Sequence, residues 1–410
     1  MKRTCAKNQQ TRLQNYRVFI VGRIENKRLQ EMKKLITVCC GLIQIFLILG
    51  VSAGFSEEQC KPPAPELQIR PFCKLGTGKA DASLSAVNPP DGLAFTGDGL
   101  LLATDAMNHR VQIFDPYSGE HLGSIGNPGF FKGEIANIIV LPDKGLLISD
   151  ETANQIYQFR RIAISPVAFQ WISPPLLSGE GFKKLCGMAC DSKRRIYVVD
   201  GITGQVRRYF SDFKPDFSWK FQSLRPDNAP ILNKAEGIAM DESREMLFLA
   251  SEWDSMIHVF NLGTGKWTGK SIGRETDALT GKPVGQSVFS RSVEGLAVIE
   301  NYLLAIDEGK ISTQTKCHGH LLVFDLRSSV LYETDAGKCR KRMRDGIADG
   351  LVGWLGSYLS PDSVAIFPGS TKHPEPLVAV ADQGSYVVWV YKWEDIKKEI
   401  TKSCKKGKIP

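Results

Sequence analysis

The sequence predicts an all-β fold, a six-bladed β-propeller that follows an N-terminal signal segment. Three observations predict it. Short runs of β-forming residues alternate with turn residues, the same unit recurs six times, and no helical periodicity of useful length occurs inside the units. The units start at residues 91, 137, 186, 236, 294 and 362, which are 46 to 68 residues apart. This period is typical of a four-stranded propeller blade.

The clearest unit is the fourth, at residues 235–260. An apolar run at 237–240 is followed by a polar turn at 241–244, and two further runs of β-formers occupy 246–250 and 256–260. Parallel strands would need helical crossovers between them, and no helical periodicity of useful length occurs inside the units. Each unit is therefore predicted to be an antiparallel meander.

The first 53 residues do not share this pattern. Residues 1–31 are polar and basic, which is typical of an upstream extension. Residues 32–53 combine a basic start, an apolar run at 35–51 and small residues at the end, which predicts a cleaved signal peptide and an exported protein, periplasmic or extracellular. The alternative is an uncleaved membrane anchor, because 17 mostly apolar residues approach the length of a span.

The remaining segments are predicted in chain order. Residues 54–88 form a proline-containing lead-in that contributes an edge strand closing the ring, and residues 89–396 form the propeller. Residues 397–410 are expected to be a basic, solvated and partly disordered tail.

The charge balance argues against a nucleic-acid partner. The whole chain has 52 Lys+Arg and 44 Asp+Glu, for a net charge of +8. The first 53 residues hold ten basic and two acidic residues, so the rest has 42 of each and is formally neutral. Nucleic-acid binding needs a persistent basic face. We expect a small-molecule substrate instead, and no stable membrane insertion once the signal segment is removed.

Seven cysteines follow the signal segment, and an exported protein can form disulfides. We favour the pairs Cys60–Cys73 and Cys317–Cys339, although sequence alone cannot fix connectivity. Cys186 and Cys190 are expected to pack in the core rather than to bind a metal, because no second Cys/His pair lies near them.

Carboxylates recur at two positions of the unit. The second strand of every unit ends in one, and four first strands begin with one: Asp105, Asp150, Asp200, Glu252, Asp307 and Asp382, then Asp91, Glu236, Glu294 and Asp362. If these positions face the propeller axis they form an acidic ring, which a hard cation such as calcium would compensate. The alternative is that the second-strand Asp residues cap turns by accepting backbone N–H bonds.

The strongest metal candidates are Glu236, Glu252 and Glu294, because glutamate is a poor turn residue. Asp307 and Asp382 are the further candidates. Lys310 and Arg291 flank the acidic positions of the fifth unit and are candidates for binding a phosphate, with Asp91 and Asp362 as further substrate-contacting residues. No residue is assigned as the catalytic group.

The second half of the chain resembles the β-propeller phytases and the wider phytase-like propeller family. The resemblance is carried by short motifs around Glu236, Glu252 and Glu294, and by residues 345–350, 380–384 and 391–394. The first two units resemble NHL-type repeats, as in residues 105–111. The phytase resemblance implies that the three glutamates coordinate calcium ions that bridge to the substrate phosphate and activate water.

The resemblance implies a secreted, calcium-dependent phosphoester hydrolase that releases phosphate from a phosphomonoester such as phytate. Two alternatives stay open. One is a non-catalytic, NHL-like binding propeller, and the other is a calcium-dependent lactonase- or esterase-like propeller.

Overall fold

The computed structural model describes residues 64, 66–126, 130–163, 167–178, 181–276, 283–284, 287–311, 316–327 and 351–405. The chain divides into two units, Met1–Gly54 and Phe55–Pro410. All described residues belong to the second unit. The predicted upstream extension and signal peptide lie outside the described residues.

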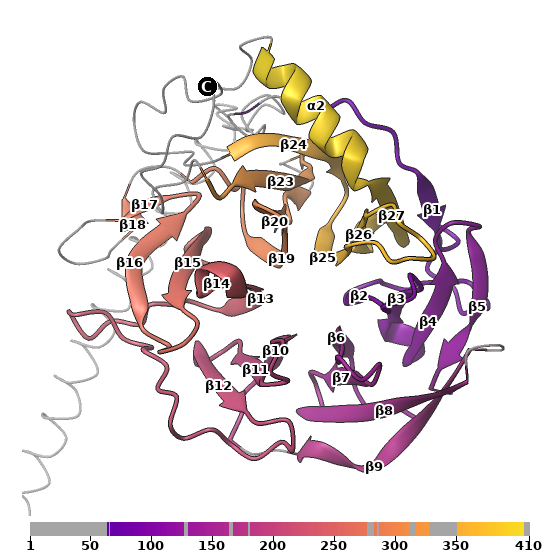
Figure 1. Cartoon of the computed structure of the whole chain (residues 1–410), viewed down its shortest axis with the longest axis horizontal. Coiled ribbons are helices and arrows are strands. Elements are labelled where there is room, and N and C mark those ends of the chain that lie inside the picture. The colour runs from indigo at the N-terminus through magenta and orange to yellow at the C-terminus, as the bar shows by residue number, and fades with distance from the viewer. Residues whose placement is uncertain are drawn as a thin grey trace, which may run out of the picture. The chain divides into compact units, whose positions relative to one another are not determined.

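Six small antiparallel sheets form a ring in the second unit, so the predicted six-bladed β-propeller is confirmed (Figure 1). The first three blades comprise β2 (Leu93–Phe95), β3 (Leu101–Asp105), β4 (Arg110–Asp115) and β5 (Glu120–Ile125); β6 (Ile135–Val140), β7 (Leu146–Asp150), β8 (Gln155–Ala163) and β9 (Ala168–Ser178); and β10 (Leu185–Cys190), β11 (Ile196–Asp200) and β12 (Gln205–Tyr209).

The other three blades complete the ring. They comprise β13 (Ala235–Asp241), β14 (Met246–Ser251), β15 (Met256–Asn261) and β16 (Trp267–Ile272); β19 (Val293–Ile299), β20 (Tyr302–Asp307), β23 (Gly319–Asp325) and β24 (Leu351–Tyr358); and β25 (Pro361–Phe367), β26 (Leu377–Asp382), β27 (Val387–Lys392) and β1 (Cys73–Leu75).

Two short hairpins and four helical segments supplement the blades. These are β17 (Glu275–Thr276) with β18 (Pro283–Val284), β21 (Lys310–Ile311) with β22 (Lys316–Cys317), the 3-10 turns η2 (Ala106–Asn108), η3 (Glu242–Arg244) and η4 (Gln383–Ser385), and the helix α2 (Trp393–Lys405). No helix among the described residues is long and apolar enough to cross a membrane.

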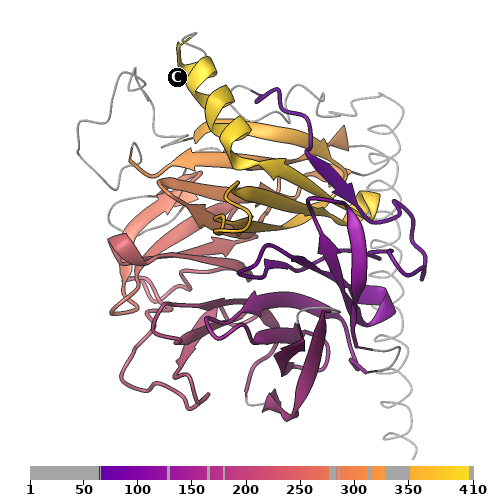
Figure 2. The same cartoon turned by 45° about the vertical axis from the view of Figure 1, so that its right-hand side comes forward.

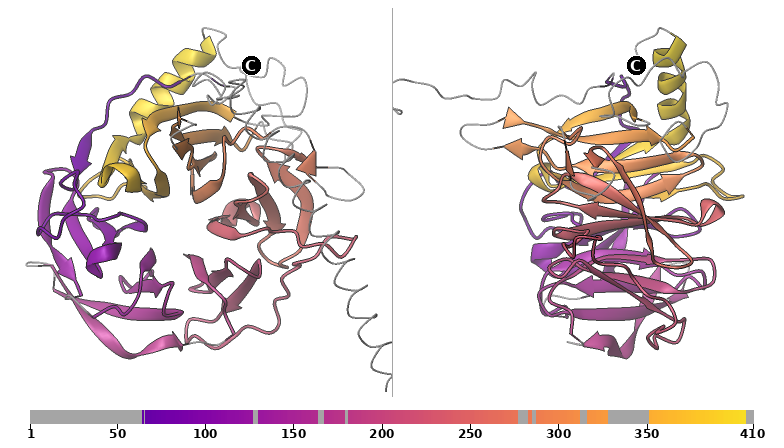
Figure 3. Two further views of the ribbon diagram at one scale, coloured as in Figure 1. Left: turned by 180° about the vertical axis from the view of Figure 1, so that it is seen from behind. Right: turned by 90° about the vertical axis from the view of Figure 1, so that its left-hand side faces the viewer.

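The ring is closed by the lead-in segment, as predicted. β1 pairs antiparallel with β27, with Cys73 opposite Val390 and Leu75 opposite Val388. The first and last parts of the propeller therefore share one sheet, and Figures 2 and 3 show β1 beside the final blade from an oblique direction and from behind. Pairing the two ends of the unit in this way removes the exposed strand edges that an open ring would leave.

Apolar side chains fill the spaces between neighbouring blades. Among the described residues they form six clusters, each shared by two adjacent blades. The second strands are buried on both faces, and all five residues of β3 and all six of β26 are buried. This explains why the second strands are continuous apolar runs in the sequence rather than alternating ones.

The C-terminal segment corrects one expectation. Residues 397–405, expected to belong to a basic, solvated and partly disordered tail, belong to α2. Trp393, Ile396 and Ile400 lie on one helix face and are buried against the cluster between blades five and six. The apolar spacing of three and four residues was visible in the sequence, but the surrounding lysines obscured it.

The cysteines correct another expectation. Cys73 is a free thiol, so it does not form the predicted disulfide with Cys60. Cys60, Cys339 and the side chain of Cys317 lie outside the described residues. Cys186 and Cys190 are also free thiols.

Candidate functional site: an acidic cavity at the propeller axis

An irregularity recurs at the beginning of the innermost strands. In five blades the pairing between the first and second strands shifts register by one residue there, for example between Ala235 and Ile238 of β13 and between Val293 and Leu296 of β19. A β-bulge of this kind turns a side chain away from its normal direction in the strand. The residue that follows the first paired position lines a central cavity in each of these blades.

The cavity has a volume of about 350 Å³. All six blades contribute the residue at the equivalent inner position, which is Asp91, Ala136, Cys186, Glu236, Glu294 or Asp362 in chain order. The structure therefore brings together four of the predicted site residues. It also places Cys186, expected in the core, at the cavity wall.

The glycine after the inner acidic residue has a packing role. A Cβ on Gly237 would clash with the carbonyl oxygen of Glu294 in the next blade, and a Cβ on Gly295 would lie 2.7 Å from the carbonyl oxygen of Asp362. Neighbouring blades can approach this closely only where the residue has no side chain. In each Glu-Gly pair the glutamate therefore lines the cavity and the glycine permits the contact between blades.

The aspartates that end the second strands accept hydrogen bonds from backbone N–H groups and do not line the cavity. Asp307 accepts hydrogen bonds from the backbone nitrogens of Ser290 at 3.0 Å and Arg291 at 3.4 Å, and Asp382 accepts one from the backbone nitrogen of Ser360 at 2.9 Å. These bonds fix the turn that enters each blade. Within the described part of the chain, neither Asp307 nor Asp382 lines the cavity, so the structure does not bring them to the predicted metal cluster.

The side chain one residue later faces the cavity instead. Glu151, Glu308 and Gln383 follow the turn-capping aspartates of blades two, five and six, and all three line the cavity. In blade four the capping residue is Ser251, whose hydroxyl accepts a hydrogen bond from the backbone nitrogen of Asn233 at 2.9 Å. Glu252 is therefore equivalent to Glu308 rather than to Asp307. The comparison of the units in the sequence placed Glu252 one position too early in the repeat, together with the capping aspartates.

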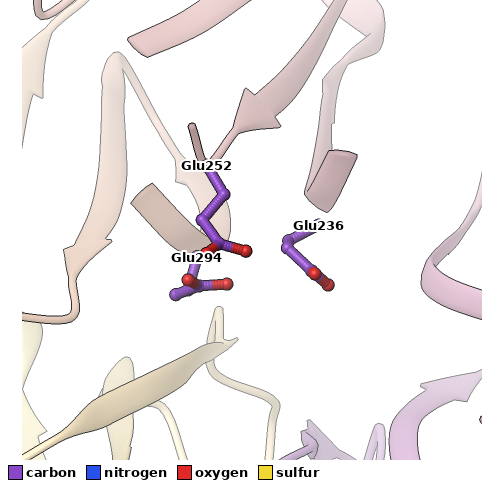
Figure 4. A group of neighbouring side chains, drawn as sticks. All are labelled: Glu236, Glu252 and Glu294. Carbon is purple, nitrogen blue, oxygen red and sulfur yellow. The ribbon is translucent and has the colours of Figure 1, made fainter. Parts of the chain in front are cut away.

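Three glutamates converge in the cavity, as Figure 4 shows. Glu236 lies in β13, Glu252 directly follows β14, and Glu294 lies in β19. One carboxylate oxygen from each lies within 4.8 Å of those of the other two. The sequence-based prediction that these three residues form a cluster agrees with this geometry.

Lysine side chains balance part of this negative charge. The ammonium group of Lys234 contacts the carboxylate of Glu252 and lies 3.5 Å from Glu236 Oε1. Lys184 Nζ lies 2.8 Å from Glu151 Oε1 and 3.5 Å from Glu236 Oε1. Burial alone would lower the pKa of Lys234, but the hydrogen bond to Glu252 and the nearby carboxylates outweigh it and raise the pKa.

Of the two basic residues predicted to bind phosphate, only the side chain of Arg291 lies in the described part of the structure. Arg291 lines the cavity, and its Nη1 lies 2.7 Å from Glu308 Oε2. Ser292 donates its hydroxyl hydrogen to the same oxygen at 2.7 Å. Lys310 begins β21, and its side chain lies outside the described part of the structure.

Asp91 and Asp362 form a pair where blade one meets blade six. Their side chains share a hydrogen bond, and Gln383 donates to Asp362 Oδ2 at 3.0 Å. Burial, together with other carboxylates around the cavity, raises the pKa of both groups. Two carboxyl groups that share a hydrogen bond hold one proton between them, so this pair can store a proton at neutral pH.

The electrostatic balance of the cavity is strongly negative. Of the described residues that line it, eight are acidic and three are basic: Asp91, Glu134, Glu151, Glu236, Glu252, Glu294, Glu308 and Asp362 against Lys184, Lys234 and Arg291. Burial and the charges of Asp362, Glu236, Glu252 and Glu308 raise the pKa of Glu294 well above its usual range. A cation would relieve this repulsion.

The geometry fits calcium. Calcium bonds oxygen at 2.3–2.6 Å, so two ligand oxygens on opposite sides of the ion lie about 4.6–5.2 Å apart. The three glutamate oxygens lie within 4.8 Å of one another, and carboxylates are the ligands this ion prefers. Glu236, Glu252 and Glu294 would hold the ion, with Lys234 displaced from Glu252.

Sequence reasoning missed five charged residues of the cavity. Glu134, Lys184 and Lys234 precede the innermost strands, and Glu151 and Glu308 follow the turn-capping aspartates. The available signal was their position in the repeat. The backbone nitrogens of Glu151, Gly201 and Glu252 donate to the carbonyl oxygens of Glu134, Lys184 and Lys234, so each pair of positions is equivalent from blade to blade.

Comparisons with known proteins support the fold. No protein-family model matches the chain, and no curated protein matches it. The PQQ-bound aldose sugar dehydrogenase from Streptomyces coelicolor is 15% identical, with a TM-score of 0.51, covering 80% of this chain and 100% of that one. At this identity the likeness concerns the fold alone: the chain is a six-bladed β-propeller.

Two further solved structures are more distant. A protein of unknown function from Bacteroides thetaiotaomicron is 12% identical, with a TM-score of 0.48, covering 81% of this chain and 75% of that one. A streptogramin B lyase is 10% identical, with a TM-score of 0.44, covering 76% of this chain and 96% of that one.

Proposed function

We propose that this protein is a calcium-dependent hydrolase of phosphoesters that acts in the axial cavity. The observation that carries the proposal is the convergence of Glu236, Glu252 and Glu294, whose carboxylate oxygens lie within 4.8 Å of one another. When bound, calcium would polarise the phosphoryl oxygen and lower the pKa of a coordinated water. The resemblance of this region to phytase-like propellers points in the same direction.

The chain supplies groups for the substrate as well. Lys184, Lys234 and Arg291 line the same cavity as the glutamates, and each can donate charge-assisted hydrogen bonds to phosphate oxygens. Lys234 now neutralises Glu252 and Glu236. Its ammonium group becomes available to a phosphate once these carboxylates have another partner.

The Asp91–Asp362 pair offers a proton in the same cavity as the three glutamates. The shared hydrogen bond and the raised pKa of both groups keep one proton on the pair near neutral pH. A leaving alkoxide needs a proton, and a carboxylic acid with a raised pKa can donate it. In this proposal the glutamates hold the metal and the aspartate pair acts as a general acid.

A second candidate is hydrolysis of a neutral carboxylic ester or lactone. The observation that favours it is the excess of eight acidic over three basic residues around the cavity. Each of those basic residues already contacts a glutamate. A polyanion such as phytate would meet repulsion here, whereas an uncharged ester would not.

The test is hydrolysis by the purified protein with calcium or with EGTA. The substrates are inositol hexakisphosphate, p-nitrophenyl phosphate and an aliphatic lactone. We expect calcium-dependent phosphate release that Glu294→Gln abolishes and that Glu120→Gln, an exposed glutamate of β5, leaves intact. Lactone opening without phosphate release would establish the second candidate. Calcium binding without turnover, or no calcium effect at all, would leave a binding propeller.

A further inference from the structure

Large apolar side chains are exposed at symmetry-related positions of three blades, in the turn that follows the second strand. Met107, Ile202 and Trp253 each occupy the second position after the second strand of their blade, and their exposed fractions are 65%, 66% and 74%. The equivalence is visible in the backbone, because Met107 donates to the carbonyl of Asn88 and Trp253 to the carbonyl of Asn233. Trp253 directly follows the cavity residue Glu252.

Blade six also has an exposed apolar side chain in this region, but that side chain comes from a different segment of the chain. Its equivalent residue is Gly384, which directly follows the cavity residue Gln383. Leu359, 43% exposed, lies against this glycine, because a Cβ on Gly384 would be 2.6 Å from the Cβ of Leu359. Four of the six blades therefore present an exposed apolar side chain in this turn or packed against it, and we call Met107, Ile202, Trp253 and Leu359 the apolar rim.

Single exposed apolar side chains are ordinary and need no explanation. Three of them at matching positions, together with Leu359 packed against the equivalent glycine of blade six, form a pattern that indicates a binding surface. The rim and the cavity differ sharply in chemistry, because the cavity is lined mainly by charged side chains. A ligand that contacts both must have a polar end and an apolar end.

The cavity volume limits what can enter. A volume of about 350 Å³ lies near the lower end for small-molecule sites, and charged groups line much of it. It can hold a phosphate or ester head group together with its metal. An alkyl chain attached to that head group would have to leave the cavity and lie across the rim.

We propose that the substrate is an amphiphile, an ester of a long alkyl chain whose head group enters the cavity while the chain packs on the apolar rim. This inference rests on the proposed hydrolase function for the identity of the head group. It commits to the substrate's own alkyl chain as the occupant of the rim, because the rim adjoins the cavity at Glu252 and Gln383.

The experiment measures chain-length dependence in binding and in turnover separately. Methyl, butyl, octyl and dodecyl phosphate are titrated into the protein with calcium by calorimetry, below their micellar concentrations, and phosphate release is followed in parallel. Partial burial of the chain should tighten binding by about twofold for each added methylene. Trp253→Ser and Met107→Ser should flatten this dependence.

Phe217→Ser is the matched control. Phe217 is 77% exposed but lies in the segment after β12, outside the rim, so its replacement should leave the dependence unchanged. Chain-dependent binding without phosphate release would support the amphiphile and reject the phosphohydrolase. Equal affinity for methyl and dodecyl phosphate would overturn the amphiphile, whether or not phosphate is released.

A membrane surface is the competing occupant. Phosphatidylcholine vesicles are therefore added in a sedimentation assay. Binding to vesicles that requires Trp253, combined with no chain-length dependence for monomeric phosphates, would overturn the proposal in favour of a membrane-docking face.

Discussion

Blades four and five differ from blades two and three at the cavity although their backbones are alike. All four have a bulge at the start of the innermost strand. The side chain at the bulged position is Glu236 or Glu294 in one pair of blades and Ala136 or Cys186 in the other. The scaffold therefore depends on buried, repeated positions, and the chemistry depends on the few side chains that the bulges expose.

The largest expected effect tests the scaffold side of this comparison. Gly237→Ala should lower the free energy of unfolding by about 2–3 kcal/mol, because the added Cβ would collide with the carbonyl of Glu294 in the next blade. Gly97→Ala is the control, since nothing lies within 4 Å of a Cβ there. Urea denaturation measures both. Equal stability of the two variants would show that the close contact between blades is not needed.

Two variants test whether the capping residues serve stability and the cavity residues serve calcium binding. Asp307→Ala should cost about 2 kcal/mol of stability, because it removes the buried carboxylate that accepts hydrogen bonds from the backbone N–H groups of Ser290 and Arg291. It should keep the rise in melting temperature that calcium causes. Glu294→Gln should do the reverse, losing the calcium effect while keeping full stability without the ion.

The opposite outcome would contradict this division of roles. A calcium response that disappears in Asp307→Ala at normal stability would return Asp307 to the metal site, as the sequence alone had suggested. Thermal melts with calcium and with EGTA provide the measurement for both variants.

The sequence could predict the fold because the second strands are buried on both faces. Their unbroken apolar runs, each ended by an acidic or small polar residue, mark the blade period directly. The pairing of Glu236 and Glu294 with a following glycine could also be recognised, because the same backbone contact recurs between neighbouring blades.

The rest of the site depends on details that the repeat hides. Ser251 replaces the capping aspartate in blade four, so Glu252 was aligned with residues that have a different role. Lys184 and Lys234 precede strands in what looks like ordinary loop sequence. Lys234 lies two residues before Glu236, whereas Lys184 is 52 residues away in the sequence. The packing of blade three against blade four brings Lys184 Nζ to 3.5 Å from Glu236 Oε1.

The third prediction concerns pH and calcium. Burial and neighbouring carboxylates raise the folded-state pKa of Glu294, Asp91 and Asp362 above the unfolded values of about 4. These groups therefore contribute stability that is complete below about pH 4 and is lost as the pH rises through the raised folded values. Calcium must displace the protons, so its dissociation constant should rise about tenfold per unit fall in pH for each proton released.

Calorimetry in two buffers with different ionisation enthalpies measures the number of protons released. Asp91→Asn removes one partner of the proton-sharing pair and should lower that number. A calcium dissociation constant that is the same at pH 5.5 and pH 8 would show that the cavity carboxylates are already ionised.

The smallest expected effect lies at the outside of the ring and has the opposite sign. Arg161 of β8 binds Asp98 through two hydrogen bonds of 2.6 and 2.9 Å and so links blade two to blade one. Burial would raise the pKa of Asp98, but the bonds from Arg161 and Thr96 outweigh it and lower the pKa to about 2. This contribution is present above the unfolded value of about 3.9 and is lost as the pH falls toward 2.

Solvent limits its size, because the Asp98 side chain is 40% exposed. Asp98→Asn should therefore lower the free energy of unfolding by about 0.5–1 kcal/mol at pH 7 and low salt, and by less at pH 3 or in high salt. Urea denaturation under these conditions gives the comparison. A deficit that grows at pH 3 would mean that Asp98 is protonated in the native protein, as the cavity carboxylates are, and the contrast between an ion-paired periphery and a proton-holding axis would fail.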